Sequence, residues 1–541
     1  MLKQKLFTFI NAFGLSIGIA FSILIYLFVK DENSFDKFHK NASSIYRIDE
    51  FAYRTWNPTP DNLYQQSAYL HVGLAPILKE ELPEVKYASR FNGGWDQVVK
   101  YEDKIFTENV AFTDNDFFKM FSFEILKGNK ESFLLDPSEI VITESIAQKY
   151  FGSTDALNKV FSIDIRGVKD FVVAGVVADP PANSSLDFQM LISQVNRPYY
   201  ERNMTEWRNF STPTFVQLNA GTSRAQLMTN LRSIRDKLMK EDMEESKKQY
   251  DIPDDVIQFE FRATNLLDIH LHKEVNWHKV SDQQYSLILG GLAILIIIIA
   301  SINYISLALT TSAARRKEVG VRKSIGASKT QLAYQFTFES LLIAVVSMIF
   351  GIILMLIFLP NFNEFTSKSI EVTPLSLLEL MGVSFLLASL LGLVAGSYPS
   401  FVLSAFNPSG VLKGGGTGPK VKSGLAKPLV LLQFTLSSAL IISAFVMYEQ
   451  MYFITSKDLG FDKEQVLVVP TQLGWNEESD RAIERMRNAL KQNPHIVSVG
   501  GVSNSFNHGW SRYGYEIEGE NKAAYVWSID ADYLPTMGIE L

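Results

Sequence analysis

Long apolar runs divide this chain into membrane-crossing and water-facing parts. Leu6 to Val29, Tyr285 to Ser312 and Leu341 to Leu359 contain no charged residue. Each run is long enough to cross a bilayer as a helix. Two further apolar runs, Leu375 to Ser397 and Leu429 to Met447, bring the predicted spans to five. The pattern therefore predicts an α-helical membrane protein.

The first apolar run has a competing interpretation as a cleaved signal peptide. However, it is longer than the usual apolar region of such a peptide, and no small-x-small cleavage site precedes Lys30. Lys3 and Lys5 before the run also favour a start on the cytoplasmic side. An uncleaved membrane anchor is the interpretation we favour.

Between Lys30 and Gln284 the pattern changes to that of a water-facing α+β domain. Short apolar strands alternate there with amphipathic helices and ordinary turn signals. The predicted strands are Ser138–Thr143, Phe171–Ala178, Leu186–Ser193 returning beside it, and Thr214–Leu218, and the predicted helices are Glu144–Tyr150 and Arg224–Met239. A large extracytoplasmic domain is thus expected between the first and second spans.

Basic segments fix the predicted orientation of the spans. Ala313 to Lys329 carries six cations and the single acid Glu318, and Phe401 to Lys427 carries lysines and no acid. Loops of this kind stay in the cytoplasm under the positive-inside rule. The predicted division is 1–29 span, 30–284 periplasmic domain, 285–312 span, 313–329 cytoplasmic loop, 330–359 span, 360–374 outer loop, 375–400 span, 401–427 cytoplasmic linker, 428–448 span and 449–541 partial second periplasmic domain.

An internal repeat is a further prediction. A helix, a proline and an apolar strand surround Pro83, and the same order surrounds Pro494. The segment from Asp114 likewise resembles the segment from Asp530, at nearly the same separation along the chain. We therefore expect the start of a second repeat after the fifth span, and a longer, duplicated protein of which this chain is a part.

Bulk composition excludes several classes of function. The 541 residues carry a net charge of −7, the pI is near 5.7 and the mean hydropathy is +0.05. This balance fits a few spans with large water-facing parts, and it argues against a nucleic-acid binder, whose working face is basic. The chain has no cysteine, so disulfides, thiolate metal sites and cysteine nucleophiles are excluded.

No group of residues predicts catalysis or a bound cofactor. Gly414 to Lys420 is glycine-rich but has Pro419 and Val421 where a phosphate loop needs Gly and Ser or Thr. His270, His272 and His278 suggest a metal site only weakly, because no clear carboxylate accompanies them, and a polar strand edge is the simpler interpretation. Glu339 lies in an apolar helix, where structural and functional roles are equally open.

The basic segment also carries a family resemblance. Ala314 to Ser328, with Gln331 and Phe338 to Leu342, closely resembles the signature of the FtsX/MacB-like permeases of ABC systems. Supporting matches are Asn11–Leu15, Phe35–Ala42, Ile45–Arg47, Val141–Ala147, Tyr150–Gly152, Gly396–Ser400, Asn407–Pro408 and Val411–Gly414. The water-facing domain is thus similar to a MacB-type periplasmic core domain, and the last three matches are similar to the join between halves of duplicated, eight-span members.

The resemblance implies that the loop between the second and third spans forms a coupling helix, expected over Glu318 to Ala327, that docks on a separate cytoplasmic ABC ATPase dimer. ATP and Mg would bind to that partner and not to this chain. Glycines there allow close approach, apolar residues such as Val319 and Ile325 offer contact, and charged residues can pair with the partner. The predicted coupling residues are Arg315, Arg316, Lys317, Glu318, Gly320, Val321, Arg322, Lys323, Gly326 and Ala327, with Glu339 as a separate intramembrane candidate.

The expected function is that of a non-enzymatic permease subunit in the bacterial inner membrane. It would convert ATP hydrolysis by its partner into periplasmic movement, and export or extract a peptide, lipoprotein or antibiotic. The alternative is a non-transporting regulator that activates a periplasmic partner such as a cell-wall hydrolase. Membrane lipids and a periplasmic adaptor or hydrolase are the other expected partners. One family feature is absent, because only Met1 to Lys5 precede the first span where members carry an amphipathic helix.

Overall fold

The computed structural model of the protein divides into two compact units. One contains Met1–Ser34 and Asp282–Lys457, and the other contains Phe35–Ser281 and Asp458–Leu541. The structure describes residues 5–55, 59–205, 207, 209–275, 277, 279–404, 426–471, 473, 477–505, 511–517 and 520–540. We describe each unit by itself.

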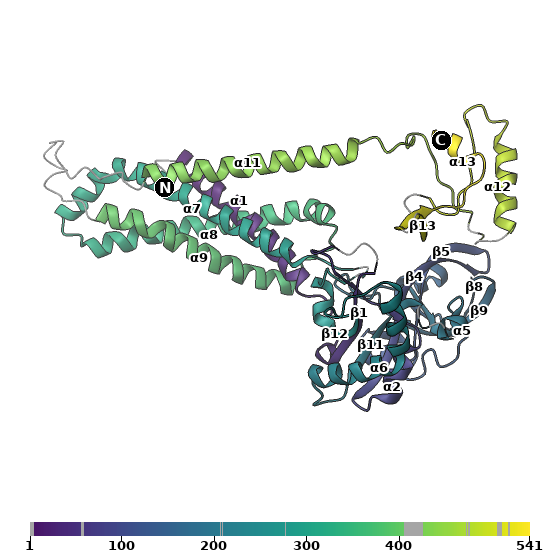
Figure 1. The fold of residues 1–541 in the computed structure, drawn as a ribbon. Coiled ribbons are helices and arrows are strands. Elements are labelled where there is room, and N and C mark those ends of the chain that lie inside the picture. The colour runs from purple at the N-terminus through teal and green to yellow at the C-terminus, as the bar shows by residue number, and fades with distance from the viewer. Residues whose placement is uncertain are drawn as a thin grey trace. The chain divides into compact units, whose positions relative to one another are not determined.

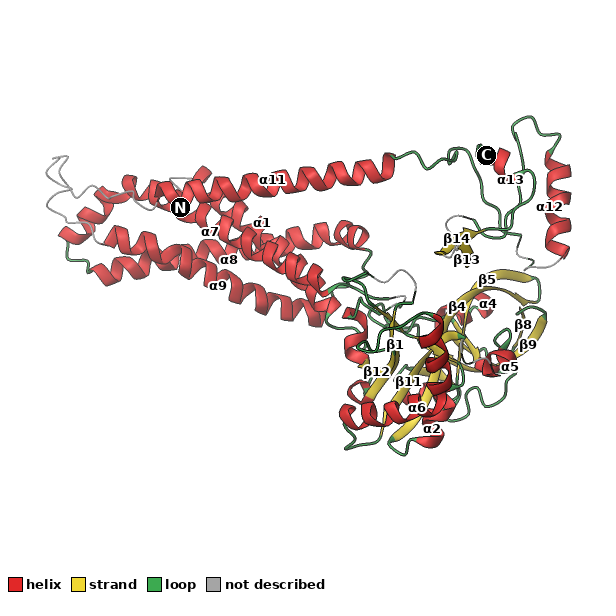
Figure 2. Cartoon of the chain, in the orientation of Figure 1, coloured by secondary structure: helices red, strands yellow, loops and turns green. Residues whose placement is uncertain are grey.

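Long apolar helices form the first unit (Figures 1 and 2). They are α1 (Lys5–Glu32), α7 (Gln283–Ser324), α8 (Lys329–Thr366), α9 (Pro374–Ser404) and α11 (Ala426–Ser456). Each contains a stretch long and apolar enough to cross a bilayer. Every apolar run of the sequence lies inside one of these helices. Most of the predicted linker over 401–427, including its glycine-rich stretch, lies outside the described residues.

Two helices continue beyond the predicted spans. Helix α7 continues to Ser324, so most of the predicted coupling segment over 313–329 is helical. Helix α8 continues through Pro360 to Thr366, although the outer loop was predicted to begin at that proline. Tertiary contacts hold these last turns of α8. Phe362 packs edge to face against Phe28 with ring centroids 6.4 Å apart, and the Asn363 amide donates to the Ile370 carbonyl at 2.9 Å.

Helix α1 packs closely against α7, α8 and α9. Its buried apolar side chains meet those of α8 and α9 in one cluster, which includes Leu15, Ile19, Ile23, Met348, Met355 and Leu391. Glycines allow this approach. A Cβ atom on Gly18 would lie 3.2 Å from the Cβ of Ala300, and one on Gly351 would lie 3.1 Å from the Ser16 carbonyl oxygen. Small residues at helix contacts are a usual means of tight packing in membranes.

Replacing Gly351 with valine is expected to loosen the helical unit. The new side chain would meet Ile19 and the α1 backbone, and such overpacking costs about 1–3 kcal/mol. Thermal unfolding of the purified protein in detergent measures the effect, and a lower midpoint is expected. Gly382→Val is the matched control, because a Cβ there meets nothing within 4 Å. Equal midpoints for the two variants would contradict the packing described for α1 and α8.

Residues 35–281 form the extracytoplasmic domain, built around one mixed sheet in the order β12-β1-β11-β4-β5-β10-β7-β9-β6. Strand β2 also pairs with β1, β3 pairs with β11, and β8 pairs with both β4 and β9. The strands are β1 (Ile45–Tyr53), β2 (Tyr64–Ser67), β3 (Tyr69–His71), β4 (Val85–Tyr101), β5 (Lys104–Thr113), β6 (Ile125–Lys127), β7 (Glu139–Thr143), β8 (Val160–Asp164), β9 (Val168–Val177), β10 (Met190–Ser193), β11 (Phe210–Leu218) and β12 (Phe259–Asn265).

Short helices connect and cover these strands. They are η1 (Ala42–Ser44), α2 (Leu74–Glu81), α3 (Phe117–Met120), α4 (Glu144–Phe151), η2 (Gln194–Asn196), α5 (Tyr200–Thr205), α6 (Arg224–Gln249) and η3 (Leu266–Leu271). The predicted strands and helices from Ser138 to Tyr150 and around Phe171, Thr214 and Arg224 are thereby confirmed. The predicted neighbour of the Phe171 strand is wrong. Strand β10 pairs with β5 and β7, and β7 lies between β10 and β9.

Strand β4 joins the two halves of this sheet. Its first part pairs with β11, and its second part pairs with β5 and β8. The register shifts between Asn92 and Trp95, where Gly93 and Gly94 lie. A Cβ on Gly94 would fall on the Asn109 side chain, so a larger residue there would displace that side chain. On either side of this shift in register, the first and second parts of β4 pack in different buried clusters.

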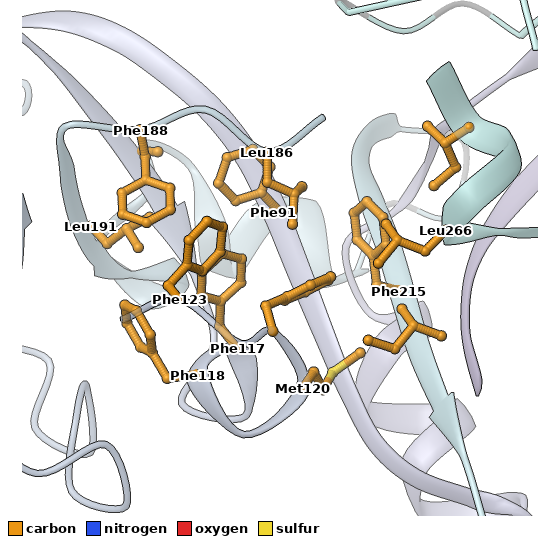
Figure 3. Packing of buried hydrophobic residues seen from close by; sticks show 14 of the residues in the cluster. Phe91, Phe117, Phe118, Met120, Phe123, Leu186, Phe188, Leu191, Phe215 and Leu266 are labelled. Carbon is orange, nitrogen blue, oxygen red and sulfur yellow. The ribbon is translucent and has the colours of Figure 1, made fainter. Parts of the chain in front are cut away.

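Three buried clusters fill this domain. The largest is rich in phenylalanine and is shown in Figure 3, where Phe91, Phe117 and Phe215 come from β4, α3 and β11. In the second cluster, Leu227 and Leu231 of α6 pack with sheet residues such as Val216. In the third, helix α4 packs on strands that include β7. The domain therefore has hydrophobic cores of its own.

Two buried ionisable side chains lie near the start of the domain. The Asp36 carboxylate accepts a hydrogen bond from the Ser185 N–H at 2.9 Å, and His39 Nδ1 accepts one from the Ser122 N–H at 3.0 Å. Burial raises the pKa of Asp36 to about 6 and lowers the pKa of His39 to about 3. Hydrogen bonds from Ser185, and after them His270 and Lys279, oppose the rise in the pKa of Asp36. The phenyl rings of Phe38, Phe121 and Phe123 surround His39.

These two shifts predict opposite effects of pH on stability. His39 resists protonation in the fold, so its contribution is lost as the pH falls below about 6.5. Asp36 prefers its proton in the fold, so its contribution is lost as the pH rises through about 6. Each effect reaches at most about 1.4 kcal/mol per pH unit. Between about pH 6 and pH 4 they oppose each other, and the unmodified protein should change little from these groups.

Single substitutions should separate the two effects. In His39→Gln, Asp36 is the one of the two groups that still titrates, so we expect stability to rise on acidification from about pH 6 to pH 4. Asp36→Asn leaves His39 alone, so we expect stability to fall over the same interval. Thermal unfolding followed by tryptophan fluorescence measures both. Parallel pH profiles for the two variants would show that these groups do not titrate as described.

Residues 458–540 contain α12 (Glu477–Leu490), β13 (Ser511–Ile517), β14 (Glu520–Val526) and α13 (Tyr533–Thr536). Strands β13 and β14 pair in the same register as the β4–β5 hairpin. Trp95 pairs with Val110 and Tyr101 with Lys104, while Ser511 pairs with Val526 and Ile517 with Glu520. Each hairpin thus closes through the same number of residues.

The residues around this hairpin also show matching hydrogen bonds. The Arg90 N–H donates to Asp114 at 2.8 Å, and the Gly501 N–H donates to Asp530 at 2.8 Å. Phe91 pairs with Thr113, and Val502 pairs with Ile529. Helices α3 and α13 both begin three residues after these aspartates, with Asp116 and Asp532 as N-caps. The similarity predicted for the two sequence segments extends to their geometry.

Candidate functional site

The turn between α7 and α8 contains the described part of the predicted coupling segment. Helix α7 ends at Ser324, and Gly326 follows with a φ of +105°, a conformation that favours glycine. Ser328 then starts α8 with a capping box, in which its hydroxyl accepts from the Gln331 N–H and the Gln331 side chain accepts from the Ser328 N–H. The turn is therefore a short, well-defined link between two long helices.

The apolar residues of this turn divide into two groups. Val319 has an exposed fraction of 0% and packs with Leu332 and Phe336 of α8, which closes the helix pair. Val321 and Ile325 are instead 47% and 82% exposed. The sequence assigned all three to contact with a partner. Val319 packs inside the helix pair, and of these three residues Val321 and Ile325 are available as an apolar surface.

The charged and small residues also differ in their surroundings. Arg322 donates to the Gln335 side chain at 2.6 Å and so links the end of α7 to α8. Burial, with a smaller effect of Lys329, lowers the pKa of Lys323. Gly320 is buried, and its carbonyl accepts from the Ser324 hydroxyl at 2.9 Å. Ala327 packs partly against the Val319 cluster.

Other predicted residues are not part of the described turn surface. The side chains of residues 307–318 lie outside the described part of the structure, and these include Arg315, Arg316, Lys317 and Glu318. Their backbone belongs to α7. Glu339 is half-buried on α8, about three helical turns after Ser328. Its neighbour Ser340 accepts from the Tyr304 hydroxyl at 2.7 Å, so this level of the bundle holds α7 to α8.

The three histidines are not arranged as predicted. His270 and His272 were placed on an extended segment, but His270 lies in η3 and His272 caps its end. His270 is buried, stacks on Phe35 with ring centroids 3.4 Å apart, and lies 3.0 Å from the Lys279 carbonyl oxygen through Nδ1. His278 is outside the described residues. Among the residues that the structure describes, no group of His, Cys, Asp and Glu has the arrangement of a metal site.

Comparison with known families identifies the two parts of the chain. Residues 8–234 match the family described as MacB-like periplasmic core domain, and residues 290–403 match the family described as FtsX-like permease C-terminal. The second match contains the α7–α8 turn. The chain belongs to the FtsX/MacB-like permease family. This permease is thus an inner-membrane protein with a periplasmic domain.

Several curated proteins are similar to this permease. The macrolide export ATP-binding/permease protein MacB of Pasteurella multocida is 21% identical over 74% of this chain and 56% of its own length. The pyoverdine export ATP-binding/permease protein PvdT of Pseudomonas syringae pv. syringae is 26% identical over 51% of this chain and 39% of its own length. The ABC transporter permease YvrN of Bacillus subtilis is 24% identical over 45% of this chain and 56% of its own length. The permease therefore spans about half the length of these relatives, or less.

Sequence reasoning missed one polar cluster at the opposite end of the helices. Lys368, between α8 and α9, pairs with Glu32 at 2.5 Å and with Asp31 at 2.9 Å, and both acids lie in the last turn of α1. We call these three residues the outer clamp. A lone lysine in a short outer loop and two adjacent acids after a span were visible in the sequence, but nothing local indicated that they meet.

Proposed function

We propose that this chain is the permease subunit of an ABC-type complex, and that the α7–α8 turn docks on a separately encoded cytoplasmic ATPase dimer. The observation that carries the proposal is the exposure of Val321 and Ile325 on a rigidly capped turn, inside the region that matches FtsX-like permeases. Covering apolar side chains of this kind with a partner contributes favourable free energy to docking. ATP and Mg would bind to the partner, and this chain would carry no catalytic residue.

The proposed topology follows from the charges. The five apolar helices would cross the membrane with the α7–α8 turn and the lysine-rich 401–427 segment in the cytoplasm. Residues 35–281 and residues after α11 would then lie in the periplasm. ATP-driven movement of the helices would reach the periplasmic domain through its two connections, at Ser34 and at Asp282.

Residues 458–540 are proposed to be the first part of a second copy of the periplasmic domain. Support comes from the matching hairpin register and from the paired hydrogen bonds of Asp114 and Asp530. A cation from the preceding helix also meets the capping aspartate in both places, as Lys79 with Asp116 and as Arg487 with Asp532. These three matches favour duplication over coincidence.

Export is the favoured use of this cycle, since the names of MacB and PvdT specify export. A substrate such as a peptide, lipoprotein or antibiotic would leave the membrane or periplasm through movement of the outer domain. An FtsX-like regulator would use the same ATPase contact to activate a periplasmic hydrolase. Release of substrate from reconstituted vesicles separates the two, because the regulator would release none.

Co-purification tests the proposal itself. The full-length protein, expressed with a separately encoded ABC ATPase, is expected to retain that ATPase through affinity purification in detergent. ATP hydrolysis by the isolated permease is expected to be absent and to appear with the partner. A permease that hydrolyses ATP alone, or that retains no ABC ATPase under these conditions, would contradict it.

A further inference from the structure

The outer clamp joins elements that are far apart in the chain. Glu32 is the last residue of α1, and its side chain is 2% exposed, while the Lys368 side chain is 15% exposed. The Lys368 ammonium also lies 5.6 Å from the centre of the Phe28 ring. A buried carboxylate of this kind depends strongly on its cation, because an unpaired buried charge is costly. The end of α1 is therefore fixed to the α8–α9 connection.

The connection that presents Lys368 is itself rigid. Lys368 follows Ser367, the C-cap of α8, and the Lys368 backbone N–H donates to the Asn363 carbonyl at 2.9 Å. Asn363 then holds Ile370 by two hydrogen bonds, of 2.9 and 3.2 Å. Ile370 is buried in the core of the helical unit. Lys368 is thus held by α8 and does not lie on a free loop.

Hydrogen bonds to the last turn of α1 hold the residues that follow this helix. The Asn33 and Ser34 N–H groups donate to the carbonyls of Val29 and Asp31, at 3.1 and 2.9 Å. Both side chains donate to the same carbonyls at 2.7 Å. Phe35 follows at once as the first residue of the outer domain. A shift of the last turn of α1 would therefore act directly on the start of that domain.

A single helix separates the coupling turn from the outer clamp. Helix α8 begins one residue after Ser328 and has 38 residues, which is about 57 Å of helix at about 1.5 Å per residue. It carries a buried stripe along its length against the rest of the bundle, with Leu332, Ala344 and Met355 among its members. Force applied at the turn would reach Lys368 through one continuous element.

We propose that Lys368 is a positioning residue which, by holding Glu32 and Asp31, transmits movement of α8 to the first connection of the periplasmic domain. This inference rests on the proposed function. The clamp adds to the apolar packing of α1 on α8 and α9, and it fixes the last turn of α1 beside the first connection, while the second connection leads into the outer end of α7. Movement of the outer end of α8 relative to the outer end of α7, away from the Val319 and Ser340 contacts that join the two helices, would then change the relation between the two connections and turn the outer domain.

Spin-label distances test this inference in the full chain with its ATPase. Because the sequence has no cysteine, two introduced cysteines carry the only labels, at the exposed residues Glu364 and Ser153. In the unmodified background, ATP is expected to shift the measured distance. In Lys368→Met the ATPase should still bind and hydrolyse ATP, but the shift should be lost. Lys368→Arg, which retains the charge, should restore it.

Two further variants distinguish transmission from simple stability. Lys30→Met breaks the exposed pair of Lys30 with Glu379 at the same end of α1, and it should leave the shift unchanged. Lys368→Met combined with Glu32→Gln leaves no unpaired charge at the buried position, so it should fold yet still lack the shift. A normal shift in this double variant would overturn the inference while docking stands. Absence of any ATP-dependent shift in the unmodified background would overturn both this inference and the proposed function.

Discussion

Replacing Val321 and Ile325 together with aspartate is expected to abolish co-purification of the ATPase. Both side chains are exposed on the α7–α8 turn and neither belongs to its packed cluster, so the turn itself should persist. Truncating a central interface residue costs about 2 kcal/mol or more, and a carboxylate adds the cost of its own desolvation. Together the two changes should weaken binding by more than about a hundredfold.

Conservative variants provide the control for this prediction. Val321→Ile and Ile325→Leu retain apolar side chains at both positions, so the retained ATPase should equal that of the unmodified protein. Val319→Ala should act differently, because it removes a buried contact with Leu332 and Phe336 and lowers stability by roughly 1–3 kcal/mol. Full retention of the ATPase by the double aspartate variant would show that this turn is not the docking surface.

Replacing Arg90 with methionine is expected to destabilise the periplasmic domain by about 3–5 kcal/mol. Arg90 as a whole is 4% exposed, and its guanidinium donates twice to Asp114, through Nε at 2.8 Å and Nη2 at 2.6 Å. It also donates to the Val72 carbonyl at 2.9 Å and the Tyr200 hydroxyl at 3.3 Å. Without the guanidinium, the Asp114 carboxylate keeps only the backbone N–H of residue 90 among these donors. The Val72 carbonyl loses the hydrogen bond that it accepts from Arg90.

Chemical denaturation followed by tryptophan fluorescence measures this loss. Arg487→Met is the matched control, since Arg487 pairs with Asp530 and Asp532 while its side chain is 30% exposed. Solvent screens that contact, so the control should cost about 1 kcal/mol or less. Similar losses for the two variants would mean that the Arg90 contact is no more important than an exposed ion pair.

Local pattern was sufficient to predict the helices and much of the outer domain. Apolar runs such as Leu6 to Val29 determine where membrane helices lie, and the alternation around Val141 indicates a strand. Helix ends were less predictable. No glycine or proline lies between Ser312 and Val319, and from Val319 to Ser324 the one such residue is Gly320. Helix α7 therefore continues past its apolar part.

Contacts between distant segments could not be predicted from local pattern. The position of β10 depends on pairing with both β5 and β7, and nothing in Met190–Ser193 specifies those partners. The same holds for the outer clamp, because an ion pair between Lys368 and Glu32 has no local signal. In the candidate site, the basic charges and the family resemblance identified the segment but did not tell buried Val319 from exposed Ile325. That difference depends on how α7 packs against α8.

Cross-linking from the α7–α8 turn tests the docking of an ABC ATPase most directly. The absence of native cysteine allows Ile325→Cys to carry a single photoreactive label, which can be activated in membranes that contain the ATPase. A cross-linked product of the permease with that ATPase is predicted. The same label at Ser153 in the periplasmic domain should give none. If Ile325 gives no ATPase product, or if the Ser153 label gives it equally well, the turn is not the coupling site.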